Sequence, residues 1–310
     1  MIEEKIILNK DGEYPLNGKL TLPDTIDKPC PAVVFVHGSG SSNMDEKIVS
    51  VTPFKDLAQG LAEYGVASIR YDKRTFAHGK KMMKDKSKII TIKEETIDDC
   101  LSAVEYIRKD PRIDPNRVYI VGHSMGAMLA PRIDAEGGNF AGMIMLAGTP
   151  RKLEEIVIDQ LTQALEIMHP FLKFLSQGKI RKMIKNFDGL YELSDEEAKK
   201  IKYAGGITMY YFKEMGEHPT PMYLEKTSKP MLILQGEDDI QVSVERDFQE
   251  YQRLLEGRAN VTYRVYTGLN HAFVQSQGST ILNATKEFSK AQNIGENVIC
   301  DIANWIQEQE

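Results

Sequence analysis

The middle of the chain alternates between short apolar runs and segments with helical periodicity. The apolar runs that predict strands are residues 33–36, 66–71, 118–121 and 143–146. Helices are expected between them, near residues 54–64 and 94–109. Strands that are apolar on both sides and separated by helices are typical of a parallel sheet covered on both faces. The alternation therefore predicts a doubly wound α/β domain.

Antiparallel strands are expected before this alternating region. Short apolar runs at residues 6–8 and 20–22 are separated by the turn signals Asp11-Gly12 and Asn17-Gly18, which favour tight connections between strands. The N-terminal segment therefore predicts antiparallel edge strands added to the mostly parallel sheet.

A helical segment interrupts the pattern. Residues 151–225 carry apolar side chains at helical spacing and show no clear strand. Strands return at residues 231–234 and 261–266, and the sheet would be incomplete without them. We therefore expect one α/β core made of residues 1–150 and 226–310, with residues 151–225 inserted as a helical cap. An independent helical domain is the alternative interpretation of the inserted segment.

The pentapeptide Gly122-His123-Ser124-Met125-Gly126 directly follows the predicted strand at 118–121 and precedes helix-favouring residues. A strand, a sharp turn and a helix are the context that a G-x-S-x-G nucleophile elbow requires. The two flanking glycines let the backbone turn tightly, because no Cβ atom stands in the way. Ser124 is therefore the candidate nucleophile, with its hydroxyl at the tip of the strand.

One histidine lies where a base for Ser124 is expected. A serine hydroxyl is a poor nucleophile at neutral pH, so it needs a base within hydrogen-bond reach and a carboxylate that orients the base. In a fold of this kind the nucleophile, the acid and the histidine follow in that order, each after a strand. His271 follows the strand at 261–266 and is the predicted base, whereas His37 and His123 are expected to hold the backbone of turns.

Three adjacent carboxylates follow the strand at 231–235, namely Glu237, Asp238 and Asp239. Their chemistry alone does not distinguish them. Asp239 lies three residues past Gly236 and three before the apolar Val242, a spacing that suits a turn with one carboxylate directed inward. Asp239 is therefore the predicted acid.

Backbone N–H groups that could stabilise an oxyanion lie at two of the predicted turns. Attack on a carbonyl creates a negatively charged oxygen, and one backbone donor aimed at it is commonly worth about 10²–10³ in rate. Met125 follows the nucleophile at a helix N-terminus, and the turn His37-Gly38-Ser39-Gly40 offers the N–H of Ser39. A phosphate-binding loop is the alternative for this turn, but neither G-x-G-x-x-G nor the P-loop pattern is present. We expect no cofactor and no metal.

Together these motifs resemble those of the α/β-hydrolases, in particular the group of serine esterases and serine aminopeptidase-like enzymes. The matching pieces are His37 to Gly40, Tyr71-Asp72-Lys73-Arg74, Asp114-Pro115-Asn116-Arg117, Gly122 to Gly126, Gly236-Glu237-Asp238-Asp239 and Asn270-His271. The resemblance implies triad roles for Ser124, Asp239 and His271, and a cap over residues 151–225 that forms one wall of an acyl pocket. The sequence departs from the family's pattern at Thr75, where glycine is often found, and in the unusually basic stretch that follows.

Composition and charge exclude several classes of partner. The formal net charge is −6, so we expect neither nucleic acid nor an anionic membrane as a partner. Three widely spaced cysteines without a metal-binding pattern are expected to be reduced. An acidic N-terminus and the absence of a long apolar run favour a cytoplasmic location. The Lys-rich stretch Lys80 to Lys86, within a basic segment at 80–88, is expected to be a solvated loop.

The sequence therefore predicts a serine hydrolase, and most directly a carboxylesterase that cleaves small-molecule esters with small or aromatic acyl groups. An aminopeptidase-like peptidase and an acyl-thioesterase would use the same residues. An acidic pair in the cap, such as Glu154-Glu155, would favour the peptidase by binding a free amino terminus. A non-enzymatic binding protein with this fold is the alternative from another class.

Overall fold

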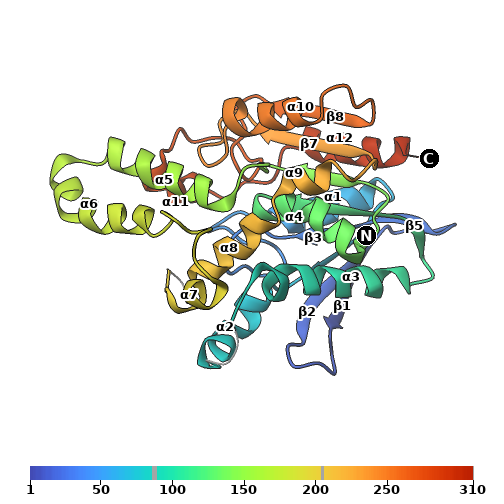
Figure 1. Ribbon diagram of the computed structural model, residues 1–310. Helices are drawn as coiled ribbons and strands as arrows, with labels where there is room; N and C mark the ends of the chain where they lie inside the picture. Colours follow the sequence, from blue (N-terminus) through green and yellow to red (C-terminus); the bar gives the residue numbers. More distant parts are fainter. Residues whose placement is uncertain (86–88, 204–205, 310) are drawn as a thin grey trace.

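A computed structural model of the chain describes residues 1–85, 89–203 and 206–309. Within these residues the centre is an eight-stranded sheet in the order β1-β2-β4-β3-β5-β6-β7-β8 (Figure 1). β2 pairs antiparallel with β1 and β4, whereas the pairs from β4 to β8 are parallel. The predicted parallel sheet with antiparallel N-terminal edge strands is confirmed. The strands are β1 (Ile2–Leu8), β2 (Leu16–Leu22), β3 (Cys30–Val36), β4 (Ala67–Tyr71), β5 (Ile113–His123), β6 (Met143–Leu146), β7 (Met231–Gly236) and β8 (Val261–Tyr266).

Helices cover both faces of the sheet and bury it completely near its centre. Val33 and Phe35 of β3 pack in the cluster that contains α1 and α12, whereas Val34 and Val36 pack in the cluster that contains α3 and α4. Neighbouring side chains of a strand point to opposite faces, so a central strand must be apolar throughout. The core helices are α1 (Pro53–Glu63), η1 (Lys93–Ile97), α3 (Asp98–Arg108), α4 (Met125–Ile133), η2 (Asp134–Gly138), η3 (Val244–Phe248), α10 (Gln249–Leu254), η4 (Ile281–Asn283), α11 (Ala284–Glu287) and α12 (Glu296–Glu308).

A group of helices lies between β6 and β7, inside the range predicted for the insertion. Its first two members form a hairpin that projects from the body of the molecule (Figure 1). The division of the chain at residues 150 and 225, and the role of these helices as a cap, stay predictions. The helices are α5 (Leu153–Ile167), α6 (Pro170–Lys185), α7 (Asp195–Lys200), α8 (Met209–Glu217) and α9 (Thr220–Leu224).

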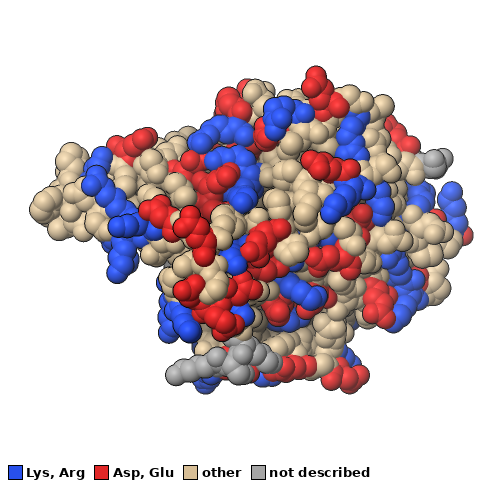
Figure 2. All heavy atoms as spheres, viewed as in Figure 1, with Lys and Arg blue, Asp and Glu red and all other residues tan. Residues whose placement is uncertain are grey.

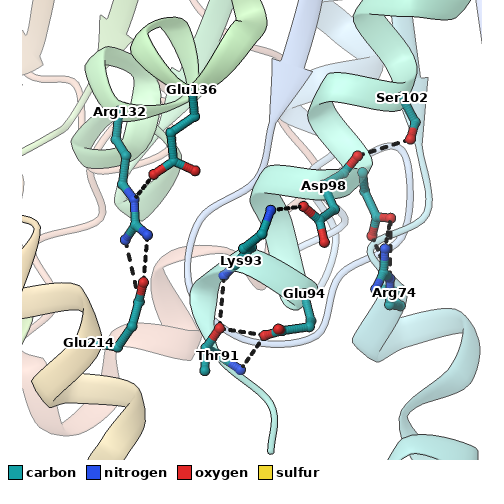
Figure 3. A network of polar contacts seen from close by, with 10 residues as sticks. Arg74, Thr91, Lys93, Glu94, Asp98, Ser102, Arg132, Glu136 and Glu214 are labelled. Atoms are coloured by element: carbon teal, nitrogen blue, oxygen red, sulfur yellow. Dashed lines mark hydrogen bonds and ion pairs between the residues drawn. The ribbon is translucent and has the colours of Figure 1, made fainter.

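A buried arginine joins the inserted helices to the core. Arg132 of α4 donates to Glu136 Oε1 at 2.7 Å and reaches both carboxylate oxygens of Glu214 in α8 (Figure 3). The Thr220 hydroxyl at the start of α9 donates to the Met128 carbonyl of α4 at 3.0 Å. Because α4 directly follows Ser124, these contacts fix α8 and α9 relative to the candidate nucleophile.

The expectation of a loop at Lys80 to Lys86 is wrong for its described part. Arg74–Lys84 is the helix α2, and residues 86–88 lie outside the described residues. Lysine and methionine are good helix formers, and Met82 is buried at 5% exposure, so the helix has both propensity and an anchor. Its lysines still point to solvent, as their charge requires.

No helix in the described ranges has the length and apolar character needed to cross a bilayer. The cysteines Cys30, Cys100 and Cys300 form no disulfide with one another, and all three lie within the described residues.

Candidate active site

Ser124 lies at the turn between β5 and α4 with φ 54° and ψ −117°. Such a backbone is strained for a residue other than glycine and is often found at functional sites. The turn is possible only because glycines surround it. A Cβ atom on Gly122 would lie 2.3 Å from the Gly126 carbonyl oxygen, and one on Gly126 would lie 2.1 Å from the Val36 carbonyl oxygen. The predicted sequence of strand, sharp turn and helix is confirmed.

Asp239 and His271 are in direct contact and are both buried. Asp239 Oδ2 lies 2.6 Å from His271 Nδ1. The Asp239 carboxylate also accepts the N–H groups of Gln241 at 2.8 Å and Val242 at 3.0 Å, and the side-chain amide of Gln235 at 2.9 Å. These donors stabilise the charged carboxylate and fix its direction. The contact at Nδ1 leaves Nε2 of His271 to face another group.

The neighbouring carboxylates differ from Asp239 in burial. Glu237 and Asp238 are exposed, whereas Asp239 is 8% exposed. The spacing argument therefore selected the carboxylate that the turn directs inward. The two strands that precede Asp239 and His271, β7 and β8, are adjacent and parallel, so their carboxyl ends bring the two residues to one edge of the sheet.

The turn after β3 lies against Ser124. A Cβ atom on Gly38 would lie 3.2 Å from the Ser124 Cβ atom. Ser39, Ser124 and Met125 line the same cavity, so the structure places both residues predicted to bind the oxyanion in one cavity with the candidate nucleophile.

Two buried side chains hold the peptide groups of Gly38. The Gly38 N–H donates to Glu46 Oε1 at 2.9 Å, and Lys73 Nζ donates to the Gly38 carbonyl at 2.9 Å. The Gly38 carbonyl and the Ser39 N–H belong to one planar trans peptide group and point in opposite directions. By holding the carbonyl, Lys73 therefore fixes the direction of the Ser39 N–H.

Glu46 and His123 connect three loops of the site. Glu46 Oε1 lies 3.1 Å from His123 Nδ1, and His123 Nε2 lies 2.8 Å from the His271 carbonyl oxygen. Burial opposes charge on both groups, but their mutual attraction outweighs it, so the pKa of Glu46 is lowered and the pKa of His123 is raised. The ion pair joins the turn after β3, the turn at Ser124 and the loop of His271.

His37 and His123 both hold backbone carbonyls, as predicted. His37 Nε2 lies 2.9 Å from the Asn43 carbonyl oxygen. Burial lowers the pKa of His37 to about 4, so its ring is neutral near pH 7 and Nε2 donates this hydrogen bond.

A cavity of about 1050 Å³ opens beside Ser124, between the core and the inserted helices. Its walls are mostly apolar, and its lining residues do not include Asp239 or His271. Apolar and aromatic residues that line it are Met125, Met128, Leu153, Ile156, Val157, Tyr203, Ile207, Tyr211 and Phe212.

One buried carboxylate, Glu95 of η1, also lines this cavity. Glu95 Oε1 lies 3.1 Å from Lys73 Nζ, and the Tyr211 hydroxyl donates to Glu95 Oε2 at 2.6 Å. The Thr75 hydroxyl lies 3.3 Å from Glu95 Oε1. Thr75, where the family pattern often has glycine, thus contributes a polar contact at the cavity wall.

Sequence reasoning missed the roles of Lys73, Glu46 and Glu95. Lys73 stands within the motif Tyr71-Asp72-Lys73-Arg74, which was matched but given no chemistry. Glu46 and Glu95 look like surface carboxylates in the sequence, because nothing near them in the chain marks their burial.

A parallel sheet of this order, with a strained serine turn and an acid–histidine pair at its carboxyl edge, defines an α/β-hydrolase. The chain belongs to the serine aminopeptidase family S33, whose family model matches residues 27–277.

The chain is also similar to proteins described as esterases. Esterase EstD of Thermotoga maritima is 35% identical over 292 residues, which is 94% of this chain and 65% of that protein. The chain therefore spans slightly less than two thirds of this relative.

Among solved structures, Est1E from Butyrivibrio proteoclasticus has a TM-score of 0.59, 17% identity and coverage of 98% of both chains. A puromycin-hydrolyzing peptidase of Mycobacterium tuberculosis has a TM-score of 0.60 and 13% identity, with coverage of 99% of this chain and 39% of that one. The fold is thus shared by proteins described as esterases and as peptidases.

Proposed function

We propose that this chain is a carboxylesterase that hydrolyses small or aromatic-acyl esters through a Ser-His-Asp triad. The observation that carries the proposal is the 2.6 Å contact between buried Asp239 and His271, on the loops beside the strained turn of Ser124. The 35% identity to an esterase supports the same class of reaction.

In this proposal Ser124 Oγ attacks the ester carbonyl carbon while His271 Nε2 takes the hydroxyl proton. Asp239 keeps Nδ1 of His271 protonated and stabilises the imidazolium that forms. His271 then returns the proton to the leaving alcohol, which leaves an acyl group on Ser124. A water molecule, activated by His271, attacks this acyl-enzyme and regenerates Ser124.

The N–H groups of Ser39 and Met125 would stabilise the oxyanion of both tetrahedral intermediates. The ammonium of Lys73 supports oxyanion stabilisation indirectly. Its hydrogen bond to the Gly38 carbonyl orients and polarises the peptide group that carries the Ser39 N–H. Lys73 is thus a positioning residue for the oxyanion site.

The cavity favours an ester over a peptide with a free amino terminus. An amino terminus needs an unengaged carboxylate, but the carboxylate of Glu95 is already bound by Lys73 and Tyr211. Glu154, the candidate from the cap, accepts a hydrogen bond from Tyr191, and neither it nor Glu155 lines the cavity. A thioester would fit the same apolar walls and is the second candidate.

Labelling with a fluorophosphonate probe, followed by a substrate panel, tests this proposal. The folded wild-type chain should be labelled at Ser124, and Ser124→Ala should not be labelled. Turnover of p-nitrophenyl and feruloyl esters should exceed turnover of aminoacyl anilides and acyl-thioesters. Absence of labelling would refute the serine hydrolase, and a preference for anilides or thioesters would replace the esterase with one of the alternatives.

A further inference from the structure

The α5–α6 hairpin ends in an exposed apolar tip. Its members are Phe171 at 65% exposure, Leu172 at 55%, Phe174 at 74%, Leu175 at 64% and, at the end of α5, Ile167 at 46%. Phe174, Phe171 and Leu175 are the three most exposed large apolar residues in the part of the chain that the structure describes. A contiguous exposed patch of this kind marks a contact with another surface.

The first half of α6 exposes its apolar side, unlike an ordinary surface helix. A helix that packs on its own protein buries its apolar face and exposes its polar face. Here Phe171, Phe174 and Leu175 are exposed, whereas Ser176 is half-buried, with its hydroxyl 3.1 Å from the Met168 sulfur. The apolar face of this half of α6 is therefore directed away from the rest of the chain.

The same helix is strongly basic. Its basic residues are Lys173, Lys179, Arg181, Lys182 and Lys185, and Pro170–Lys185 contains no aspartate or glutamate. Among the described residues, none of these five side chains has a partner in an ion pair. In Figure 2 the projecting end of the molecule is covered mainly by tan and blue side chains.

We propose that this hairpin tip docks on an anionic lipid surface. Aromatic and leucine side chains beside lysines and arginines are the combination by which a helix lies in a membrane interface, with apolar groups among the acyl chains and cations at the phosphates. The whole chain has a net charge of −6, which predicted no such partner. Charges are screened over about 8–10 Å, however, so a membrane contact depends on the charges that lie along it rather than on the net charge of the chain. Along α6 these are five cations from Lys173 to Lys185, with the exposed Glu166 of α5 as an acidic neighbour at the tip.

Charge also distinguishes lipid from a second copy of the chain. A two-fold dimer through α6 would place the same face against itself and bring two sets of five positive charges together without acidic partners on that helix. An anionic lipid surface complements them.

Docking would place the cavity close to the lipid. Leu153, Ile156 and Val157 line the cavity from the other end of α5, and ten residues of helix from Val157 to Ile167 span about 15 Å. Entry of an apolar ester from the membrane along this wall is a consequence that rests on the proposed esterase function, whereas docking itself does not.

Vesicle flotation of the full chain tests the docking. We expect binding to phosphatidylcholine vesicles with 25% phosphatidylglycerol that is at least tenfold stronger than binding to phosphatidylcholine alone, and weaker binding as salt rises. Phe171→Ser combined with Phe174→Ser should lose at least tenfold in binding. Lys179→Gln combined with Lys182→Gln should lose the preference for the anionic vesicles.

Ile7→Ser is the matched control, because Ile7 is also exposed, at 47%, but lies on the edge strand β1, outside the hairpin. All variants should retain the thermal midpoint and the p-nitrophenyl acetate turnover of the wild type, so a failure of docking is separable from a failure of the esterase proposal. Absent or equal binding to the two vesicles would overturn the docking. A dimer in light scattering that Phe174→Ser dissociates, without vesicle binding, would assign the tip to a second copy.

Discussion

At the scale of single residues, Lys73 does not line the cavity but contacts the peptide group that carries one of the proposed oxyanion donors. It is 2% exposed and donates to the Gly38 carbonyl while it is paired with Glu95. Removing its charge would release the peptide group of Ser39 and leave Glu95 without its cation. The expected loss is therefore of two kinds, one in transition-state stabilisation and one in folding stability.

We predict that Lys73→Met lowers kcat about 10²-fold, the size of effect expected for one oxyanion donor, with a smaller change in KM. The affinity for a trifluoromethyl ketone, which forms an oxyanion, should fall in parallel with kcat/KM. Lys109→Met, at an exposed lysine that does not line the cavity, is the control and should change neither. Lys73→Met combined with Glu95→Gln should recover thermal stability but not kcat. Recovery of both would mean that Lys73 is only structural.

The buried pair of Glu46 and His123 predicts a pH-dependent stability. The pKa of Glu46 is lowered from 4.5, so its contribution is present above pH 4.5 and is lost as pH falls through the folded pKa. The pKa of His123 is raised from 6.5, so its contribution is present below pH 6.5 and is lost as pH rises through the folded pKa. The pair therefore stabilises the fold most between these two values.

Urea unfolding of the wild type and Glu46→Gln at pH 5.5, 7 and 9 measures this contribution. Breaking a buried ion pair costs about 3–5 kcal/mol, so we expect a difference of that order at pH 5.5 and a smaller one at pH 9. For Asp45→Asn, one residue away on the same turn, the difference in unfolding free energy from the wild type should have no maximum near pH 5.5. A difference that is constant across the three pH values would contradict the assignment of charge to His123.

At the scale of elements, the turn at Ser124 depends on the close approach of α4 to β3. A Cβ atom on Gly126 would lie 2.1 Å from the Val36 carbonyl oxygen, which is backbone and cannot move aside cheaply. We predict that Gly126→Ala lowers the free energy of unfolding by about 3 kcal/mol, the upper end for overpacking. Urea unfolding would show it as a lower midpoint.

Gly178→Ala in α6 is the control for this substitution. A Cβ atom on Gly178 meets nothing within 4 Å, and alanine is a better helix former than glycine by about 1 kcal/mol. This variant should be as stable as the wild type or more stable. An unchanged stability of Gly126→Ala would show that the turn relaxes more easily than its packing suggests.

The elements that the sequence predicted are those whose signal is local. The central strands are buried on both faces, so each is a continuous apolar run, and the turn at Ser124 carries its own glycines. α2 was missed because its lysines favour solvent in a helix as well as in a loop, and only the burial of Met82 distinguishes the two.

The residues of the candidate site likewise include some with a local sequence signal and some without one. The turn at Ser124 and the contact between Asp239 and His271 could be predicted because each of these residues follows a strand in a fixed order. Glu95 could not, since its partner Tyr211 is 116 residues away in the chain. The hydrogen bond from Lys73 to Gly38 joins residues 35 positions apart in the chain, so the sequence alone could not predict it.

At the scale of the whole molecule, the cavity exists because two parts of the chain meet. Ser124 and Met128 belong to the core, whereas Ile156 and Val157 belong to the inserted helix α5. The buried Arg132 of α4 also binds Glu214 of α8, the helix whose Tyr211 and Phe212 line the cavity. The size of acyl group that reaches Ser124 should therefore depend on side chains of α5.

Val157→Trp tests this dependence, because it fills the cavity from the inserted wall without touching the proposed triad. We predict that kcat/KM for p-nitrophenyl octanoate falls at least tenfold, since single methylenes in an apolar pocket are worth about 10–200-fold. The value for p-nitrophenyl acetate should stay within about twofold. Val265→Trp on β8, where the side chain is 41% exposed and outside the cavity, is the matched control. An equal loss for both esters would instead place the acyl chain away from α5, because a short acyl group would then be hindered as much as a long one.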